Sequence, residues 1–502
     1  MPRSNRRFLV LGLDGATFDL LDPWMAAGEL PFLRSLVARG TRAPLASVLP
    51  AKTIPAWYSF ATGLDPGQLG IYGFTEPDGG PGKSRIVQSF RPAEAFWDRL
   101  SRQGATVGVL NFPLRAGYPL HGFVVPGMLS DLPPTYPEGL RADLEQALGE
   151  PFIPELPPYR DVDRAAWMAD ATRSVVQRGQ AAEILAERFR PDFLFALFRA
   201  TDRVQHQHWQ ELAKSFEQVP QDLRTFWRAV DTACARIDAA FRAAGGPSVT
   251  LVISDHGSGA AHSEFFTNRW LLENGYLTFR NGGDKFRRRA LSRLLQTSDR
   301  IPGARRILRP VVDRLRTSDR AARLTTAVMG EASFEGLREE IDWQRTVAYS
   351  FPVPEGIYLN PYNKSLTDAD GARLVAEMRQ KLTAFSEAHI EVFEPHELYG
   401  QVAGHQPPAL LLRIDGMATD PRMDFSYPKP FLGPRPGFFY GSGVHRMNGI
   451  LLAAGDGVPT ARIEEPLSLL DVAPTVLEGM GVPVPAAMRG RSFARRIGVG
   501  PD

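Results

Sequence analysis

The sequence of 502 residues contains a single cysteine, Cys234, and only nine histidines. One cysteine excludes an intramolecular disulfide framework and any zinc site built from cysteines. The longest apolar runs, such as 8–13 and 193–198, fall well short of the roughly 20 residues that span a bilayer. The first of these runs is also shorter than the apolar part of a secretory signal, about 7–15 residues, so we expect a cytoplasmic protein.

The sequence also lacks an excess of charge of either sign, since 58 Lys and Arg residues stand against 56 Asp and Glu. The resulting net charge of +2 gives no reason to expect nucleic acid as a partner. Hydrophobic residues make up 43% and charged residues 23%, which is typical of a globular chain and excludes a disordered one. A chain of this length can bury a large core without disulfides.

Apolar runs typical of buried strands alternate with amphipathic stretches typical of helices. Strands are expected at 8–13, 105–110, 123–125, 193–198, 248–253 and 449–454, and helices at 17–39, 161–190, 221–244 and 467–480. This alternation predicts an α/β fold in which a largely parallel central sheet carries helices on both faces.

The character of the sequence changes after residue 265. Residues 280–323 hold fourteen Lys or Arg against four Asp, and residues 340–440 are rich in Pro and Gly. We therefore predict a catalytic core of 1–264 and 441–502 that is interrupted by an inserted cap region, 265–440. The arginine-rich stretch is either a solvated helical face or a contact for an anionic substrate or membrane surface.

Polar residues gather where the expected strands end. Three aspartates follow strands, and five of the nine histidines lie at strand ends as well: Asp14, Asp202, Asp255, His206, His208, His256, His262 and His445. In open parallel sheets, ligands bind beyond the carboxyl ends of the strands. Asp202 and His206 are four residues apart, so one helical turn places both on the same face, where they can share a metal. Taken singly, these residues also fit turns, helix caps, ion pairs and structural histidines.

Together, the aspartates and histidines indicate a metal centre. Three of each are enough for two cations with three protein ligands apiece, which leaves coordination positions open for a substrate. Mixed carboxylate and imidazole ligands favour zinc, with manganese as the alternative. Thr53 begins an expected helix, where free amide groups favour negative charge, so it is either a simple N-cap or a nucleophile.

Five motifs, in this order, resemble the alkaline phosphatase superfamily and, within it, the type I phosphodiesterase/nucleotide pyrophosphatase branch. They are Leu13-Asp14-Gly15, Lys52-Thr53-Ile54-Pro55-Ala56-Trp57, Asp202-Arg203-Val204-Gln205-His206, Ser254-Asp255-His256-Gly257 and Gly443-Val444-His445. Segments 468–475 and 488–492 resemble the closing helix and loop of that family. The resemblance covers 1–275 and 340–502, and the arginine-rich stretch is the least familiar part.

The resemblance implies a two-metal phosphodiesterase. Asp202, His206 and His445 would hold one zinc. Asp14, Asp255 and His256 would hold the other, which also binds Thr53. Thr53 would attack phosphorus in line and form a covalent phosphothreonine, which water then hydrolyses.

Other activities share this ligand set. A phosphomonoesterase, a phosphonate hydrolase and a phosphoglycerate-mutase-like enzyme are alternatives within the superfamily. Thr53 argues against a sulfatase, which requires cysteine or serine at the nucleophile position. A non-catalytic metal- or ligand-binding protein on the same fold is the alternative from another class.

Four further residues are candidates for contact with a small phosphate-ester substrate: Lys52, Phe74, His208 and His262. Phe74 stands 21 residues after Thr53, where nucleotide pyrophosphatases carry an asparagine that holds a phosphoryl oxygen. This departure puts a nucleotide substrate in question. For Lys52 and the two histidines, a solvent-facing or structural role is the alternative.

Overall fold

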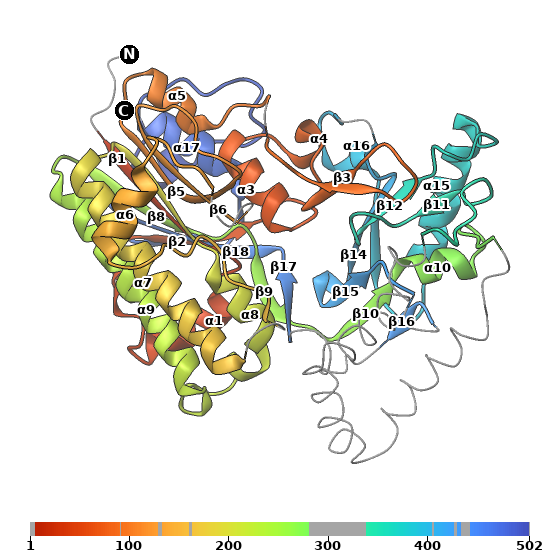
Figure 1. The fold of residues 1–502 in the computed structure, drawn as a ribbon, viewed down its shortest axis with the longest axis horizontal. Coiled ribbons are helices and arrows are strands. Elements are labelled where there is room, and N and C mark those ends of the chain that lie inside the picture. The colour runs from red at the N-terminus through yellow and green to blue at the C-terminus, as the bar shows by residue number, and fades with distance from the viewer. Residues whose placement is uncertain are drawn as a thin grey trace. The chain divides into compact units, whose positions relative to one another are not determined.

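A computed structural model of the chain describes residues 6–90, 92–128, 133–159, 163–280, 338–403, 406–425, 429–432 and 442–500. Its contacts form two compact units (Figure 1). The first comprises Met1–Phe74, Gln88–Ala260 and Tyr440–Asp502, and the second Thr75–Val87 and Ala261–Phe439. The division at 264 and 441 stays a prediction, and the contacts differ from it in grouping Thr75–Val87 with the second unit. The arginine-rich stretch lies outside the described residues beyond Arg280.

The first unit is built on a nine-stranded sheet with the order β19-β2-β18-β8-β1-β7-β5-β6, and β20 pairs with β2. Residues Phe8 and Leu13 of β1 pair in parallel with Phe193 and Phe198 of β7, and β8 pairs in parallel along the other side of β1. The strands are β1 (Arg7–Leu13), β2 (Thr41–Ala46), β5 (Val107–Leu114), β6 (Gly122–Met128), β7 (Phe193–Phe198), β8 (Ser248–Ile253), β18 (Asn448–Gly455), β19 (Ala461–Arg462) and β20 (Leu467–Ser468). The three central strands β1, β7 and β8 therefore end at the same edge.

The largely parallel sheet that the sequence predicts is confirmed, with β18 as the antiparallel member. This strand pairs antiparallel with both β2 and β8. It follows β17 (Gly443–Arg446), which pairs with β9 (Gly257–Ala260) just beyond the carboxyl end of β8. Because the chain enters β18 from that edge, the strand has to run back against its neighbours.

Helices cover both faces of the sheet, as predicted. Leu9, Leu11 and Leu13 of β1 join a core cluster with residues of α1, α2, α6, α7 and α9. On the other face, a Cβ at Gly12 would meet Trp57 of α3, and one at Gly479 of α17 would meet Phe8, so β1 packs closely there too. The helices are α1 (Phe18–Ala26), α2 (Pro31–Arg39), α3 (Thr53–Thr62), α4 (Pro66–Leu69), α5 (Phe96–Arg102), α6 (Leu140–Leu148), α7 (Arg164–Phe189), α8 (Ala200–Leu212), α9 (Gln221–Ala243) and α17 (Val472–Gly479).

The helical stretch expected over 17–39 is divided in the structure into two helices, α1 and α2. Gly28 adopts a positive φ of 82°, which ends the first helix, and Pro31 occupies the first turn of the second. Glycine and proline placed three residues apart separate the two helices although the apolar periodicity continues across them.

The second unit contains short strands and three described helices. Its strands form a four-stranded sheet β11-β12-β14-β13, a three-stranded sheet β15-β10-β16 and the hairpin β3-β4. They are β3 (Thr75–Pro77), β4 (Ser84–Ile86), β10 (Ser263–Phe266), β11 (Ala348–Tyr349), β12 (Gly356–Leu359), β13 (Ile390–Phe393), β14 (Leu410–Ile414), β15 (Thr419–Arg422) and β16 (Phe431–Leu432). The helices are α10 (Thr267–Glu273), α15 (Asp368–Thr383) and α16 (Pro395–Leu398).

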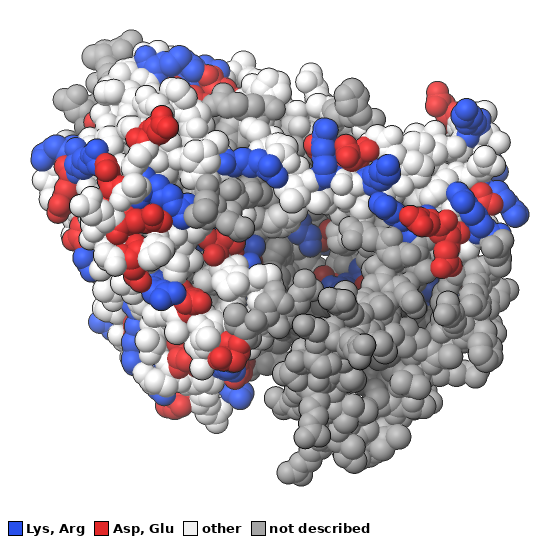
Figure 2. Space-filling view, viewed as in Figure 1, with Lys and Arg blue, Asp and Glu red and all other residues white. Residues whose placement is uncertain are grey.

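The described surface carries both signs of charge. On the face that Figure 2 draws, Lys and Arg are interspersed with Asp and Glu, as the near-zero net charge leads one to expect. Among the described residues, no helix is long and apolar enough to cross a bilayer.

Candidate active site

Three aspartates meet at the carboxyl edge of the central sheet. Asp14 follows β1 directly, Asp202 lies in the first turn of α8 after β7, and Asp255 comes two residues after β8. All three are buried. The backbone of Gly15 brings them close, because its amide donates to Asp255 Oδ1 at 3.1 Å and its φ is +69°. A Cβ at this glycine would lie 3.0 Å from Asp202 Oδ1, so a larger residue would crowd the carboxylates.

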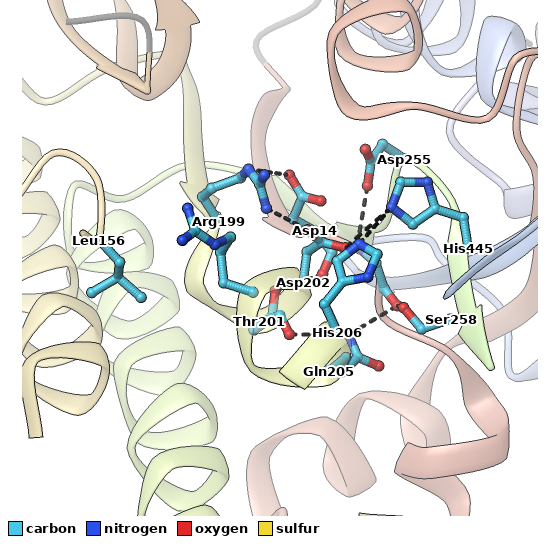
Figure 3. A network of polar contacts seen from close by, with 12 residues as sticks. Asp14, Leu156, Arg199, Thr201, Asp202, Gln205, His206, Asp255, Ser258 and His445 are labelled. Atoms are coloured by element: carbon cyan, nitrogen blue, oxygen red, sulfur yellow. Dashed lines mark hydrogen bonds and ion pairs between the residues drawn. The ribbon is translucent and has the colours of Figure 1, made fainter. Parts of the chain in front are cut away.

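Three histidines face these aspartates. His206 lies one turn after Asp202 on α8, His256 precedes β9, and His445 lies in β17 (Figure 3). The β9–β17 ladder pairs His445 with Ser258, and the rings of His445 and His256 stack with centroids 3.7 Å apart. Residues far apart in the sequence thus reach one site, because the pairing of β17 with β9 places His445 at the edge of the sheet.

The first predicted ligand group is assembled in the structure. Asp202 Oδ1 lies 3.2 Å from His206 Nε2 and 3.5 Å from His445 Nε2. The two Nε2 atoms are 2.8 Å apart. The three candidate ligand atoms therefore lie within 3.5 Å of one another.

The second predicted group is assembled beside the first. His256 Nε2 lies 3.2 Å from Asp255 Oδ2 and 3.8 Å from Asp14 Oδ1. The ligand atoms of this group all lie within 4.8 Å of one another. His256 also lies within that limit of Asp202 and His445, so its imidazole borders both groups.

Hydrogen bonds orient all three imidazoles in the same way. His206 Nδ1 donates to the carbonyl of Gly443 at 2.9 Å, His445 Nδ1 to that of Ala51 at 2.6 Å, and His256 Nδ1 to that of Gly257 at 3.1 Å. A ring that is protonated on Nδ1 has a lone pair on Nε2, which is the state that a metal ligand requires.

Several buried atoms at this site have no hydrogen-bond partner. They are Asp14 Oδ1, Asp202 Oδ1, Asp255 Oδ2 and His256 Nε2. Buried polar atoms without partners are costly, so a cluster of them indicates a missing ligand. Carboxylate oxygens and imidazole nitrogens fit divalent cations such as zinc or manganese.

Burial sets the protonation of the carboxylates. It raises the pKa of Asp14 to about 7, and that of Asp255 well above its ordinary value, helped in the latter by the charge of Asp14. Burial acts in the same direction on Asp202, but His206 and Arg199 outweigh it and hold the pKa of Asp202 well below its usual range. Binding of cations would therefore release protons from Asp14 and Asp255.

Burial also sets the protonation of the imidazoles. It lowers the pKa of both His256 and His445, which keeps these two rings neutral. It opposes protonation of His206 as well, but the neighbouring Asp202 carboxylate raises the pKa of this ring above its ordinary value. Neutral rings are ready to accept a cation, whereas His206 would first lose its proton.

The start of α3 is attached to both ligand groups. Ala51, just before the helix, accepts the hydrogen bond from His445, and Trp57 donates through Nε1 to Asp14 Oδ2 at 3.0 Å. The buried Thr53 lies between these two contacts in the first turn. The amide groups of a first helical turn lack acceptors within the helix and favour an anion there.

The four candidates for substrate contact are dispersed. Lys52 is the N-cap of α3 and lies close enough to His445 for its charge to lower the pKa of that ring. Phe74 is 37% exposed. His208 is buried against Tyr159 and binds Glu211 through Nδ1 at 2.8 Å, which indicates a structural role. His262 belongs to the second unit.

Sequence reasoning missed two residues that contact the carboxylates. Arg199 lies between β7 and α8 and binds both Asp14 and Asp202. Trp57 is the core residue that its sequence suggests, but it also donates to Asp14. The sequence gives one indication that Arg199 contacts the carboxylates: it directly follows a buried strand and lies three residues before Asp202.

The hydrogen bond from Trp57 to Asp14 leads to a prediction for the metal-free protein. Trp57→Phe leaves Asp14 Oδ2 without its donor at 3.0 Å and should lower the free energy of unfolding by about 1–3 kcal/mol more than the change of ring size alone. Urea unfolding in the presence of a chelator measures this loss. Trp227→Phe is the matched control, because Trp227 is fully buried and its Nε1 has no partner. Equal losses for the two variants would contradict the role of the hydrogen bond.

Comparison with solved structures defines the fold class. The chain superimposes on a variant of the alkaline phosphatase PafA with a TM-score of 0.54, 13% identity and 99% coverage of both chains. Phosphonoacetate hydrolase from Sinorhizobium meliloti 1021, solved with phosphonoformate and with phosphonoacetate, gives a TM-score of 0.50, 16% identity and 93% coverage of both chains. The fold is therefore alkaline phosphatase-like. No curated protein matches the chain.

The family follows from the sequence match. The family model "Type I phosphodiesterase / nucleotide pyrophosphatase" matches residues 8–341, and the chain belongs to this family. Members of the family are in general metal-dependent phosphoric ester hydrolases, and the superfamily typically depends on divalent metals. The resemblance drawn from the five motifs is thus confirmed, while the roles of the individual site residues stay predictions.

Proposed function

We propose that the chain is a two-metal phosphodiesterase that acts through a covalent phosphothreonine on Thr53. The observation that carries this proposal is the pair of ligand groups, whose buried oxygen and nitrogen atoms converge without hydrogen-bond partners beside the start of α3. Membership of the type I phosphodiesterase/nucleotide pyrophosphatase family supports the same class of reaction.

The residues present fit two divalent cations. Asp202, His206 and His445 would hold one, and Asp14, Asp255 and His256 the other. Cations bound there would supply positive charge to the phosphoryl oxygens, which is the main requirement of phosphoryl transfer. The protein's own contribution is to keep the imidazoles in the ligating tautomer and to exclude water from the carboxylates.

Thr53 is the proposed nucleophile. Its Oγ1 would form a bond to phosphorus as the bond from phosphorus to the leaving oxygen breaks, and the hydroxyl proton passes to solvent. Water would then cleave the bond between phosphorus and Thr53 Oγ1, which restores the hydroxyl and releases the phosphate monoester that remains from the diester. The free amide groups of the first turn of α3 are suited to hold the negative phosphoryl group during both steps.

The substrate class is where alternatives arise. Phe74, with an exposed aromatic ring, stands where nucleotide pyrophosphatases hold a phosphoryl oxygen through asparagine, so this chain lacks that polar contact. A phosphomonoesterase or a phosphonate hydrolase with the same ligand groups is the second candidate, since a phosphatase and a phosphonate hydrolase share the fold.

A paired measurement on one purified sample tests the proposal. Elemental analysis should find close to two divalent metal ions per chain, and bis-p-nitrophenyl phosphate should be hydrolysed faster than p-nitrophenyl phosphate. Chelation should abolish this hydrolysis, because the carboxylates and imidazoles alone cannot neutralise the phosphoryl charge, and zinc or manganese should restore it. Preference for the monoester would assign the site to a phosphatase. If the protein neither binds metal nor hydrolyses either substrate after zinc or manganese is added, the alternative of a non-catalytic binding protein on the same fold would be favoured.

A further inference from the structure

Arg199 is a buried cation between the two ligand groups. It lies at the N-cap of α8, directly after β7, and only 11% of its side chain is exposed. Its Nη1 binds Asp202 Oδ2, and its Nε lies 3.7 Å from Asp14 Oδ2 (Figure 3). One guanidinium thus forms an ion pair with a carboxylate of each group, and its Nε, which has no hydrogen-bond partner among the described residues, is the atom that faces Asp14.

The contacts of Arg199 divide the oxygens of each carboxylate into two kinds. In Asp202, Oδ2 binds the guanidinium, and in Asp14, Oδ2 lies 3.7 Å from the guanidinium Nε and accepts a hydrogen bond from Trp57. The Oδ1 atoms face the imidazoles instead: that of Asp202 lies near His206 and His445, and that of Asp14 lies near His256. These same Oδ1 atoms have no hydrogen-bond partner. Each carboxylate therefore offers one oxygen to a cation and has the other engaged.

The geometry suits arginine and not lysine. A guanidinium is planar and presents several N–H groups in fixed directions, so it can bind two carboxylates at once. The charges of Asp14 and Asp202, with a smaller contribution from the partly exposed Glu155, keep Arg199 charged despite its burial and raise its pKa. Hydrogen bonds to ligating carboxylates from outside the metal shell fix their orientation, and removing such a partner typically costs about 10–100-fold in metal affinity.

We propose that Arg199 is a positioning residue that holds Asp14 and Asp202 as one-oxygen ligands and so fixes the geometry of both metal sites. This inference rests on the proposed function, because it assigns the two groups to cations. It goes beyond that function in assigning to the Arg199 guanidinium a role in both ligand groups.

Titration with zinc and cobalt tests the proposal on the full chain. Arg199→Met should weaken zinc binding by about 10–100-fold, measured by competition with a chromophoric chelator. It should also change the visible spectrum of the cobalt-loaded protein, because carboxylates free to bind through both oxygens raise the coordination number. Arg199→Lys keeps the charge but not the planar fork, and should recover only part of the affinity and of the spectrum.

The matched control is Arg178→Met. Arg178 is equally buried but donates to the carbonyl of Ile153 and has no described contact with Asp14 or Asp202. Its replacement should leave zinc affinity and cobalt spectrum unchanged, so an effect confined to Arg199 variants would exclude a general loss of structure. Wild-type affinity and spectrum in Arg199→Met would overturn the positioning role alone. A wild-type chain that binds neither metal would overturn the proposed function together with it.

Discussion

Replacing Thr53 with alanine is expected to abolish turnover while both metal ions remain bound. The proposed reaction passes through a bond between Thr53 Oγ1 and phosphorus, and alanine has no atom that can form it. Loss of an essential nucleophile costs on the order of 10³-fold or more in kcat, and no residue at the start of α3 can replace it. Steady-state kinetics on bis-p-nitrophenyl phosphate, with elemental analysis of the same sample, measures both quantities.

Two variants serve as controls for this result. Thr53→Ser keeps a hydroxyl at the same place and should retain much of the activity. Thr62→Ala removes a buried hydroxyl from the other end of α3, where it donates to the carbonyl of Tyr58, and should leave kcat near that of the wild type. Full activity in Thr53→Ala would refute the phosphothreonine mechanism even if the metal requirement holds.

Replacing Asp255 with asparagine is expected to remove one of the two metal ions. The amide has the shape of the carboxylate and can still accept the hydrogen bond from Gly15, but it lacks the negative charge. Because Asp255 is a proposed direct ligand, zinc affinity at its site should fall by more than the 10–100-fold typical of residues outside the metal shell. Elemental analysis should then approach one ion per chain, with turnover lost.

The same variant has a second readout. Asp255 is fully buried and its pKa is raised, so the metal-free protein carries an unfavourable carboxyl group at this point. Asparagine has no charge to bury, so the free energy of unfolding of the metal-free variant, measured with urea, should be at least that of the metal-free wild type. Two bound ions and normal turnover in Asp255→Asn would remove this residue from the ligand set.

The ligand groups could be predicted from the sequence for a physical reason. Parallel strands end at one edge, so a polar residue that follows a buried strand must lie near the others that do so. Asp14, Asp202 and Asp255 each satisfy this condition. His445 is harder to place, because it pairs with a strand nearly two hundred positions earlier; the sequence shows only that it lies near the start of an expected strand.

Contacts made by side chains that cross the core could not be predicted. Trp57 satisfies every expectation for an apolar core residue, and nothing in its neighbours shows that its indole N–H faces Asp14. Arg199 is a charged residue after a strand, which usually means exposure to solvent, whereas the structure buries it. His208 lies two residues after the candidate ligand His206, where α8 departs from helical φ and ψ, and its ring packs against Tyr159.

The pairing of β9 with β17 also affects which part of the chain can be replaced without disturbing the site. The chain leaves the first unit after Ala260 and returns to it at Tyr440, and Ala260 pairs with Gly443 in the antiparallel β9–β17 ladder. The stretch between Ala260 and Gly443 therefore connects two strands that are paired with each other. A connection whose ends are already held together tolerates large changes of length. Another segment could replace this insertion, in evolution or by engineering, without altering the spacing of the candidate metal ligands on either side of it.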